Sequence, residues 1–399
     1  MTRVSLAAAF RSSGAGAILP PSTPLLDRSG ARVVLGDHVA DNGLPIPVAP
    51  GPSTLFGPRG VCFARADGPF FVTDTGHHRL LGWVHVPHAD NAPADIVIGQ
   101  PDFLSEGRNA RSVPGPATLN MPTGLASDGR MLAVADAWNH RVLIWRSLPR
   151  QSGQPADLVL GQETFGDGLA NRGRREAGPE TLNWCYGVTI ADGRLFVADT
   201  GNRRVLIWNA LPEQLGQPAD LVIGQPDMTR HDDNAASGAS AFGMRWPHAI
   251  VVEGGRIFVA DAGNSRIMVW NGMPNADGAP ASFILGQKGF EHLDHNRGCY
   301  DPTDRSLQMP YGLAVHDGVL MCADTANSRL LGLPLDRMGM DTAATSVTGQ
   351  TGFGTKGDNR WKAATRDSLC WPFGLAVCDG LVAVADTGNN RVLLWETAA

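Results

Sequence analysis

An aspartate and an arginine, five residues apart, recur six times along the 399-residue chain. The aspartates are Asp74, Asp136, Asp199, Asp261, Asp324 and Asp386, and the arginines are Arg79, Arg141, Arg204, Arg266, Arg329 and Arg391. Six carboxylates could form a metal or acid–base ring, but a catalytic group is not needed six times. An aspartate at a strand end accepts hydrogen bonds from turn amides, and an arginine can hold it in a bidentate ion pair. We therefore expect these pairs to be structural.

The densest polar cluster flanks the fourth copy of this motif. It combines imidazoles and carboxylates, which are ligands for zinc and other divalent ions. Its members are His231, Asp232, His248, His292, Asp294 and His295. Their spacing matches no standard ligand signature, so we prefer solvated loops and keep a metal site as the alternative. A second group consists of His77 and His78, with His85 and His88 nearby. It could be a second metal locus, but we interpret it as a variant turn.

The spacing of the repeated motif indicates which strands and loops position these residues. Its copies follow one another at steps of 62 or 63 residues, which marks a repeat architecture. Each copy offers four short apolar or β-branched runs bounded by Gly, Asp, Asn and Pro, as expected for a four-stranded antiparallel meander. Six such sheets predict an all-β fold, a six-bladed β-propeller. Five recurring tryptophans, Trp83, Trp145, Trp208, Trp270 and Trp395, should pack between the blades.

The two ends of the chain should meet in one blade. The sixth copy lacks its last strand, and Arg32-Val-Val-Leu-Gly-Asp37 carries the missing sequence. We predict that this N-terminal strand, about 31–36, completes the last blade and closes the ring. Residues 1–30, rich in Ser, Gly, Ala and Pro, are expected to form a flexible arm, and 31–399 a single propeller domain.

Two stretches indicate the family. Ala198-Asp-Thr-Gly-Asn-Arg-Arg-Val205, with Trp138-Asn-His-Arg-Val142 in the second copy, resembles the NHL-repeat family of six-bladed β-propellers. The resemblance covers nearly all of 31–396 and implies the fold. Members of the family include protein-binding and RNA-binding modules and a zinc-dependent lyase acting on peptidyl hydroxyglycine, so it does not select a function. That lyase holds zinc with histidines from several blades, whereas here only His248 is expected at the channel entrance.

A site must break the symmetry of the repeat, so equivalent positions were compared. The residues just before and after the proline at the start of each innermost strand differ between copies, and they should ring the mouth of the central channel. Cys185 replaces one proline; its thiol could face the channel, although a buried thiol is the interpretation that we prefer. The candidate ligand-binding set, with Cys185 kept in it, is Arg59, Met121, Thr123, Trp184, Cys185, Tyr186, Trp246, His248, Met309, Tyr311, Trp371 and Phe373. An apolar floor with a few polar groups is typical of a ligand or peptide pocket, although the same side chains could simply plug the channel.

The loops above this mouth are long. The connection from Gln162 to Trp184 runs over twenty residues, and loops of this length in compact domains are usually functional or disordered. An asparagine follows nine residues after the glutamine in five of them, which predicts a repeated turn. The asparagines are Asn109, Asn171, Asn234, Asn296 and Asn359.

Composition narrows the function classes. A formal charge of −6 and a pI near 6.0 argue against a nucleic-acid-binding face. No apolar run approaches the ~18 residues that cross a membrane, and the N-terminus makes a poor signal peptide. Six cysteines without a CxxC spacing favour a reducing, cytoplasmic location.

Together these features favour a non-catalytic NHL-repeat propeller, monomeric and without a cofactor. It is expected to act as a scaffold or accessory module that binds a protein or peptide through the face bearing the long loops. The alternative is a metal-dependent lyase or hydrolase, using zinc or another divalent ion at the channel mouth near the fourth and fifth blades.

Overall fold

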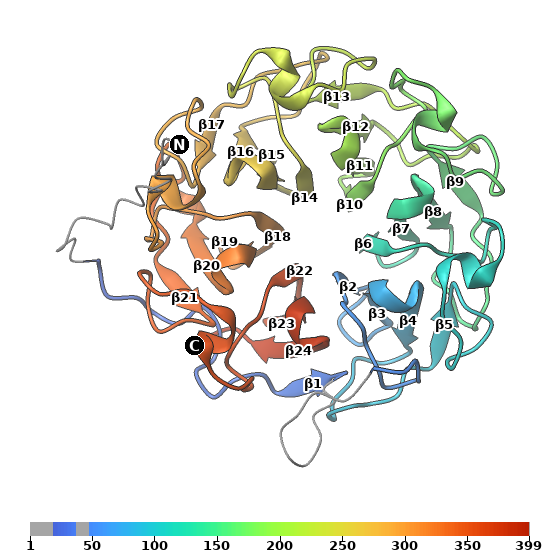
Figure 1. Cartoon of the computed structure of the whole chain (residues 1–399), viewed down its shortest axis with the longest axis horizontal. Helices are drawn as coiled ribbons and strands as arrows, with labels where there is room; N and C mark the ends of the chain where they lie inside the picture. Colours follow the sequence, from blue (N-terminus) through green and yellow to red (C-terminus); the bar gives the residue numbers. More distant parts are fainter. Residues whose placement is uncertain (1–18, 37–47, 399) are drawn as a thin grey trace, which may run out of the picture.

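The computed structural model describes residues 19–36 and 48–398. Six four-stranded antiparallel sheets surround a central channel, which confirms the predicted six-bladed β-propeller (Figure 1). From the channel outward, the blades are β2 Gly60–Phe63, β3 Phe70–Asp74, β4 Arg79–Trp83, β5 Ile96–Ile98; β6 Pro122–Ser127, β7 Leu132–Asp136, β8 Arg141–Trp145, β9 Leu158–Leu160; β10 Cys185–Ala191, β11 Arg194–Asp199, β12 Arg204–Trp208, β13 Leu221–Ile223; β14 Pro247–Glu253, β15 Arg256–Asp261, β16 Arg266–Trp270, β17 Phe283–Leu285; β18 Pro310–His316, β19 Val319–Asp324, β20 Arg329–Pro334, β21 Ser346–Thr348; and β22 Pro372–Cys378, β23 Leu381–Asp386, β24 Arg391–Glu396, β1 Val33–Leu35.

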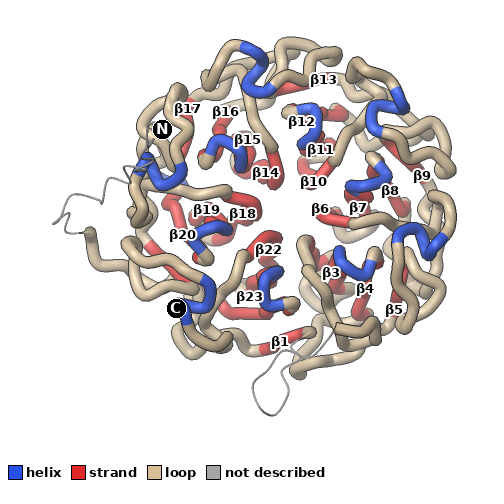
Figure 2. Tube along the Cα trace, in the orientation of Figure 1, coloured by secondary structure: helices blue, strands red, loops and turns tan. Residues whose placement is uncertain are grey.

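Short 3₁₀ helices decorate one face of the disc, which we call the loop-bearing face. An inner set lies in the turns between second and third strands: Thr75–His77, Ala137–Asn139, Thr200–Asn202, Ala262–Asn264, Thr325–Asn327 and Thr387–Asn389. An outer set lies in the long connections between blades: Arg108–Arg111, Ala170–Gly173, Asp233–Ala236, His295–Gly298 and Asp358–Trp361. Figure 2 looks onto this face and shows the two sets as concentric circles. A further 3₁₀ helix, Leu335–Arg337, follows β20.

The ring closes as predicted. Strand β1 pairs antiparallel with β24, with Val34 opposite Leu393, and is the outermost strand of blade 6 (Figure 1). Trp395 shows how far the closure extends. In blades 1 to 4 the corresponding tryptophan donates its indole N–H to a carbonyl nine residues later in the chain, whereas Trp395 donates to Asp27 at 2.7 Å. The N-terminal segment therefore supplies both the strand and the loop that blade 6 lacks.

Part of the predicted N-terminal arm, 1–18, lies outside the described residues. The described part, 19–30, lies against blades 5 and 6. Thr23 forms a parallel bridge with Ser346 on the outer strand of blade 5, and Leu26 bridges Thr397. The Leu26 side chain is buried in the cluster between these blades. This segment covers an outer strand edge that would otherwise offer unpaired backbone groups.

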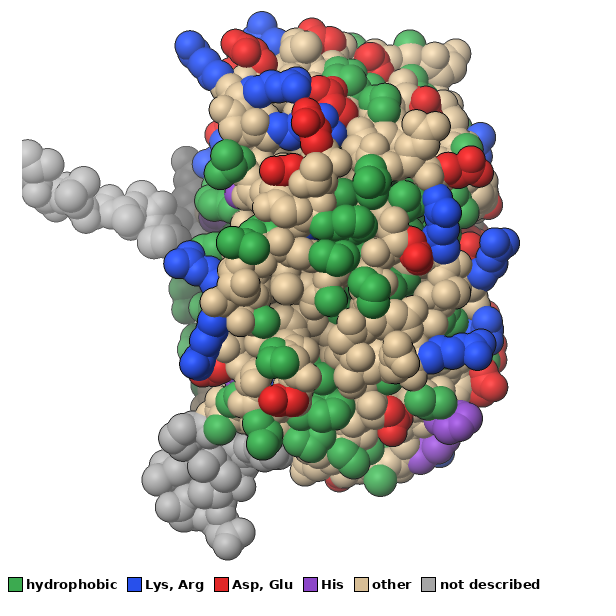
Figure 3. Space-filling view, turned by 90° about the vertical axis from the view of Figure 1, so that its right-hand side faces the viewer, with side chains coloured by type: hydrophobic (Ala, Val, Ile, Leu, Met, Phe, Trp, Pro, Cys, Tyr) green, Lys and Arg blue, Asp and Glu red, His purple; other side chains and the backbone are tan. Residues whose placement is uncertain are grey.

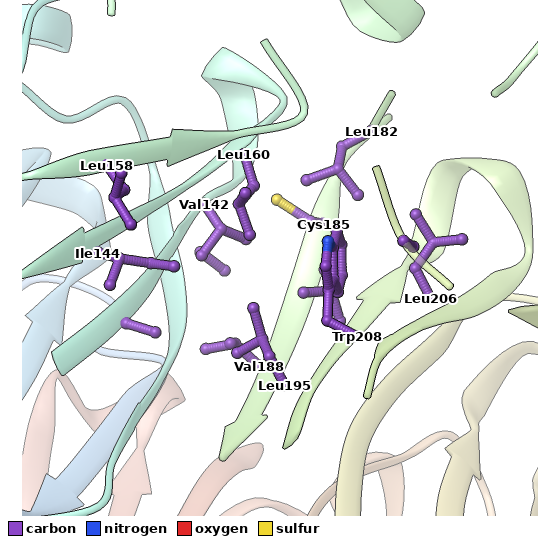
Figure 4. Close-up of a cluster of buried hydrophobic side chains, with 14 of the residues drawn as sticks. Val142, Ile144, Leu158, Leu160, Leu182, Cys185, Val188, Leu195, Leu206 and Trp208 are labelled. Carbon is purple, nitrogen blue, oxygen red and sulfur yellow. The ribbon is translucent and has the colours of Figure 1, made fainter. Parts of the chain in front are cut away.

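The hydrophobic core lies between neighbouring blades. Each blade is too thin to bury its own faces, so apolar side chains of adjacent sheets interdigitate. Figure 4 shows one such cluster, in which Val142 and Leu160 of blade 2 face Leu206 and Trp208 of blade 3. The predicted packing of the recurring tryptophans between blades is confirmed, because all five are buried.

The Asp–Arg pair ties each blade to the connection before it, and in blades 1 to 5 the arginine also binds a carbonyl of the connection after the blade. In blade 4, Asp261 Oδ1 accepts from the backbone N–H of Arg245 at 2.6 Å, and Oδ2 accepts from Arg266 Nε at 2.7 Å. The remaining guanidinium nitrogens of Arg266 donate to carbonyls in the connections before and after the blade. The pairs are therefore structural, as expected, but the ion pair is made through Nε alone and not as a bidentate fork.

The asparagines of the long connections form the predicted repeated turn. Asn109 has a left-handed φ of 52° and exchanges amide hydrogen bonds with Asn139 in the next inner turn. The other four asparagines have equally left-handed backbone and pair with the corresponding asparagine of the next blade. The loops are thereby fixed to the disc.

Replacing one arginine of a pair should destabilise the fold strongly. Arg329→Met leaves the buried Asp324 carboxylate and three loop carbonyls without their donor, so the free energy of unfolding should fall by about 3–5 kcal/mol in urea titrations. Arg305→Met, which removes a partly exposed ion pair with Asp341, is the control and should cost less than about 1 kcal/mol. Equal losses in the two variants would contradict a structural role for the buried pair.

Candidate functional site

Five side chains at the start of the innermost strands form an unbroken circle around the channel mouth. The Arg59 guanidinium carbon lies 4.9 Å from the Phe373 ring centre and 5.7 Å from that of Tyr186. The rings then follow one another from Tyr186 to His248 at 4.9 Å, to Tyr311 at 4.2 Å and to Phe373 at 4.4 Å. The sequence prediction that these positions ring the mouth therefore holds, and the stacking shows that they form one connected group.

Blade 2 contributes a small residue to the circle. Thr123 is buried and donates its hydroxyl to the Tyr186 carbonyl at 2.9 Å. We refer to Arg59, Thr123, Tyr186, His248, Tyr311 and Phe373 as the mouth residues. Behind them, a channel cavity of about 290 Å³ is lined by the six innermost strands, with small residues such as Gly60 and Gly187 among them. The mouth residues thus form the polar and aromatic end of a narrow channel whose other lining residues are mostly small or apolar.

The electrostatics of the mouth depend on a single permanent charge. His248 Nδ1 lies 2.8 Å from the Trp246 carbonyl, which can only accept, so Nδ1 carries the proton. Burial lowers the pKa of His248 to about 4, so the imidazole is neutral and its Nε2 is a free acceptor. Burial also raises the pKa of Tyr311 to about 12, which keeps the phenol neutral. Arg59 is the only charged mouth residue.

The residues before the prolines lie outside the channel cavity. Met121, Trp184, Trp246, Met309 and Trp371 all have left-handed backbone, with φ between 48° and 56°, and none of them lines the channel cavity. The three tryptophans project from the loop-bearing face instead. The alternation of residue types was visible in the sequence, but the backbone angle that turns these side chains away from the channel was not.

Large aromatic side chains therefore surround the mouth on the outside. We call Phe56, Trp138, Trp184, Trp246 and Trp371 the aromatic crown; each is between 40% and 53% exposed. The rings of Trp138 and Trp184 stack with centres 6.4 Å apart, and the Arg245 guanidinium lies 5.0 Å over Trp246. The crown thus brings several large, half-exposed apolar side chains together on the loop-bearing face.

A hydrogen bond between neighbouring blades fixes most of these left-handed residues. The N–H of Trp184 donates to His140 Nδ1 at 3.0 Å, and the N–H of Met121 donates to His78 Nδ1 at 3.1 Å. Equivalent bonds connect Met309 to Ser265, Trp371 to Ser328 and Gly57 to Asn390. Each acceptor ends an inner 3₁₀ helix, so that helix and the next blade are coupled. We call this contact the blade latch.

The latch is absent between blades 3 and 4. The equivalent residue there is Arg203, whose guanidinium has no acceptor and instead pairs with Asp233, with Nε 2.6 Å from Oδ1. In this blade, the N–H that an acceptor at position 203 would bind belongs to Trp246. The arginine at this position can be seen by comparing the repeats in the sequence. That its counterparts bind the backbone N–H of the next blade can be seen only in the structure.

Cys185, included in the candidate site, does not face the channel. Its side chain is fully buried between blades 2 and 3, where Sγ lies 3.1 Å from the Arg141 carbonyl (Figure 4). Burial raises the pKa of this thiol well above its ordinary value. The thiol therefore belongs to the hydrophobic core between these blades.

The alternative metal set is not brought together. Across 19–36 and 48–398, no group of three or more His, Cys, Asp or Glu side chains is placed to hold a metal ion. His295 Nδ1 lies 2.8 Å from Ser265 Oγ, His292 is exposed beside Glu291, and Asp232 pairs with Arg230. His231 and Asp294 stay on the loops before and after blade 4, away from His248 in the mouth.

The two adjacent histidines of blade 1 form the variant turn that we preferred. His77 is buried and its Nδ1 lies 2.8 Å from Asp74 Oδ2. In blade 2 the same position is Asn139, whose amide donates to Asp136 Oδ2 at 2.7 Å. The imidazole thus replaces an amide donor within the repeated turn.

The sequence motifs and the fold agree with a known family. Residues 369–393, which include strand β23 and the pair Asp386 and Arg391, match the NHL repeat family model. The resemblance is therefore confirmed, and the chain combines an NHL repeat with a six-bladed β-propeller. A comparison with curated proteins found no match. In the described part of the chain, no helix has the length and apolar character needed to span a membrane.

Three solved structures illustrate the fold similarity. An auxiliary nutrient binding protein from Bacteroides thetaiotaomicron is 11% identical, with a TM-score of 0.54 over 93% of this chain and 76% of that one. A structural genomics protein of unknown function from the same organism is 10% identical, with a TM-score of 0.51 over 92% and 75%. Hydrazine synthase of Kuenenia stuttgartiensis is 11% identical, with a TM-score of 0.51 over 86% and 96%. At such identities the similarity shows the fold alone.

The His140 latch predicts a pH-dependent stability. Burial lowers the pKa of His140 from 6.5 to about 4 in the folded chain, so between these values the unfolded chain binds more protons. The contribution of His140 is fully present above pH 6.5 and is lost as the pH falls toward 4. Urea unfolding across this range should show the wild type losing stability relative to His140→Asn, which keeps an acceptor as Asn390 does in blade 6. Parallel pH curves would contradict the latch.

Proposed function

We propose that this propeller binds a protein or peptide through its loop-bearing face, without catalysing a reaction. The observation that carries the proposal is the aromatic crown, five exposed aromatic side chains around a concave channel mouth. Tryptophan, tyrosine and arginine are the residues most enriched in the energetically dominant parts of protein interfaces. Here they lie together, because Arg245 stacks on Trp246 and Arg59 stacks on Tyr186.

Rigidity supports a recognition role for this face. The long connections are fixed by the Asp–Arg pairs and by the asparagine pairs, so the crown is held by hydrogen-bonded loops. Side chains that are ordered before binding lose less conformational entropy when a partner docks. The blade latches add a direct restraint on the backbone of Trp184 and Trp371.

The charge distribution supports a protein partner over a nucleic acid. The chain has a formal charge of −6. On the rim seen in Figure 3, basic and acidic side chains lie near one another and form no continuous basic stripe. Nucleic-acid-binding surfaces normally need such a stripe to neutralise phosphates.

We propose a reducing compartment, the cytoplasm, as the location of the chain, and a monomer as its state. All six cysteines are free thiols, and Cys62, Cys185 and Cys322 are buried. Size-exclusion chromatography with light scattering, together with thiol titration of protein purified without reductant, tests both statements. A disulfide-linked or dimeric species as the main form would contradict them.

Truncating the crown should abolish partner capture. Binding proteins captured from a lysate by the wild-type chain should be lost from Trp184→Ala and Trp371→Ala, with affinity of the identified partner weakened at least about 30-fold for each. Leu215→Ala is the matched control, since Leu215 is 49% exposed on the connection between β12 and β13, which lies on the rim of the disc beside the outermost strand of blade 2. Capture that depends on Leu215 and not on the tryptophans would refute the proposed face.

Binding should not require a divalent metal. The histidines and carboxylates of the alternative set contact other protein groups instead of one another, as described above. Dialysis of the purified chain against EDTA, followed by the same capture assay, should leave partner affinity unchanged within about twofold. Stoichiometric zinc by elemental mass spectrometry, with capture lost on dialysis and also in His248→Ala, would favour the metal-dependent enzyme instead.

A further inference from the structure

Arg59 carries a positive charge at the channel mouth. Across the described ranges it forms no ion pair, and no carboxylate oxygen lies within 4.0 Å of its nitrogens. Its side-chain polar contact is a long hydrogen bond from Nη1 to the Tyr186 hydroxyl, at 3.4 Å. The six arginines of the Asp–Arg pairs, by contrast, each bind a buried carboxylate. A half-buried guanidinium without a counter-charge is costly unless an anion completes the site.

The surroundings of Arg59 determine which edge of the guanidinium stays available. Phe373 and Tyr186 pack against it, so new hydrogen bonds are best made in the guanidinium plane. A planar carboxylate matches this geometry, because its two oxygens accept two parallel N–H groups. None of the six mouth residues is acidic, so nothing in the mouth repels an anion.

The size and polarity of the mouth select a small, singly charged group. One arginine is the only cation, while His248 and Tyr311 are neutral. The channel cavity behind the mouth is only about 290 Å³ and is lined mostly by small or apolar residues. A phosphate dianion is normally held by several charged or backbone donors, which this mouth does not offer.

We propose that the channel mouth is a carboxylate-binding site in which Arg59 pairs with the free C-terminal carboxylate of a peptide, while the preceding residues of that peptide contact the aromatic crown. This proposal rests on the proposed peptide-binding function. Arg59 directly precedes the innermost strand β2 and lies on the loop-bearing face, as the crown does. One ligand could therefore contact both the mouth and the crown. A small free carboxylic acid carries the same group and is the second possible source.

Matched probe pools separate these sources in affinity-selection mass spectrometry on the full chain. The probes are pooled random tetrapeptides with free C-termini, the same tetrapeptides with amidated C-termini, and pooled N-acetyl amino acids. We expect retention of the free-acid tetrapeptides at least about tenfold above the amides, because the amide removes the charge that pairs with Arg59. Preferential retention of tetrapeptide acids over N-acetyl amino acids identifies a peptide C-terminus, and equal retention identifies a small acid.

Arginine variants test the assignment of the site. Arg59→Gln should lose the preference for free acids, and Arg59→Lys should keep part of it, because it retains the charge without the planar fork. Arg256→Gln is the control, since Arg256 lies at the opposite end of blade 4 and contacts the Leu335 carbonyl. Should Arg59→Gln not fold, as judged by its urea midpoint, Tyr186→Phe tests the same site by removing the hydroxyl that contacts the guanidinium.

Two results would overturn the carboxylate site. Retention of acids and amides to the same extent, unchanged in Arg59→Gln, would show that the mouth does not distinguish a carboxylate from a neutral amide. No retention of any pool would also overturn it. In either case crown-dependent capture of a protein partner would leave the proposed function standing, so the two failures are distinguishable.

Discussion

The buried Asp–Arg pair is the constraint on which the rest of the molecule depends. One carboxylate receives an arginine and a backbone N–H, and the same arginine binds carbonyls of the connections before and after its blade. Six thin sheets thereby become a ring with fixed loops. Because every loop is held at its base, the exposed surface of the loop-bearing face is an ordered one. The crown and the mouth therefore act as a rigid surface with a single central charge.

Ring closure by the N-terminal segment extends the repeated contacts to blade 6. The N-terminal segment completes blade 6 with β1 and supplies the carbonyl that accepts the indole N–H of Trp395. Because the blades repeat the same contacts, positions that depart from the repeat can be identified. Arg59 lacks a counter-ion, and Arg203 breaks the series of latches beside Trp246. Both exceptions lie on the loop-bearing face, the face through which we propose that the chain binds its partner.

Much of the fold could be predicted from the sequence because it depends on period and pattern. The 62- to 63-residue spacing, the strand-like runs and the displaced strand at Arg32 to Asp37 were sufficient for the blades and the closure. The site was predicted only in part. The residues after the prolines were correctly placed in the mouth, but left-handed backbone at Trp184 and its equivalents, burial of Cys185 and separation of His231 from His248 depend on three-dimensional geometry that residue types do not encode.

The central claim is that one face of the disc recognises a partner. The most direct measurement is tryptophan-resolved footprinting of the full chain by carbene labelling, with and without a captured partner. The account predicts protection of Trp138, Trp184, Trp246 and Trp371, with labelling of exposed residues on the rim of the disc, such as Leu215, unchanged. Protection of the opposite face or of the rim, with the four tryptophans still labelled, would contradict the account.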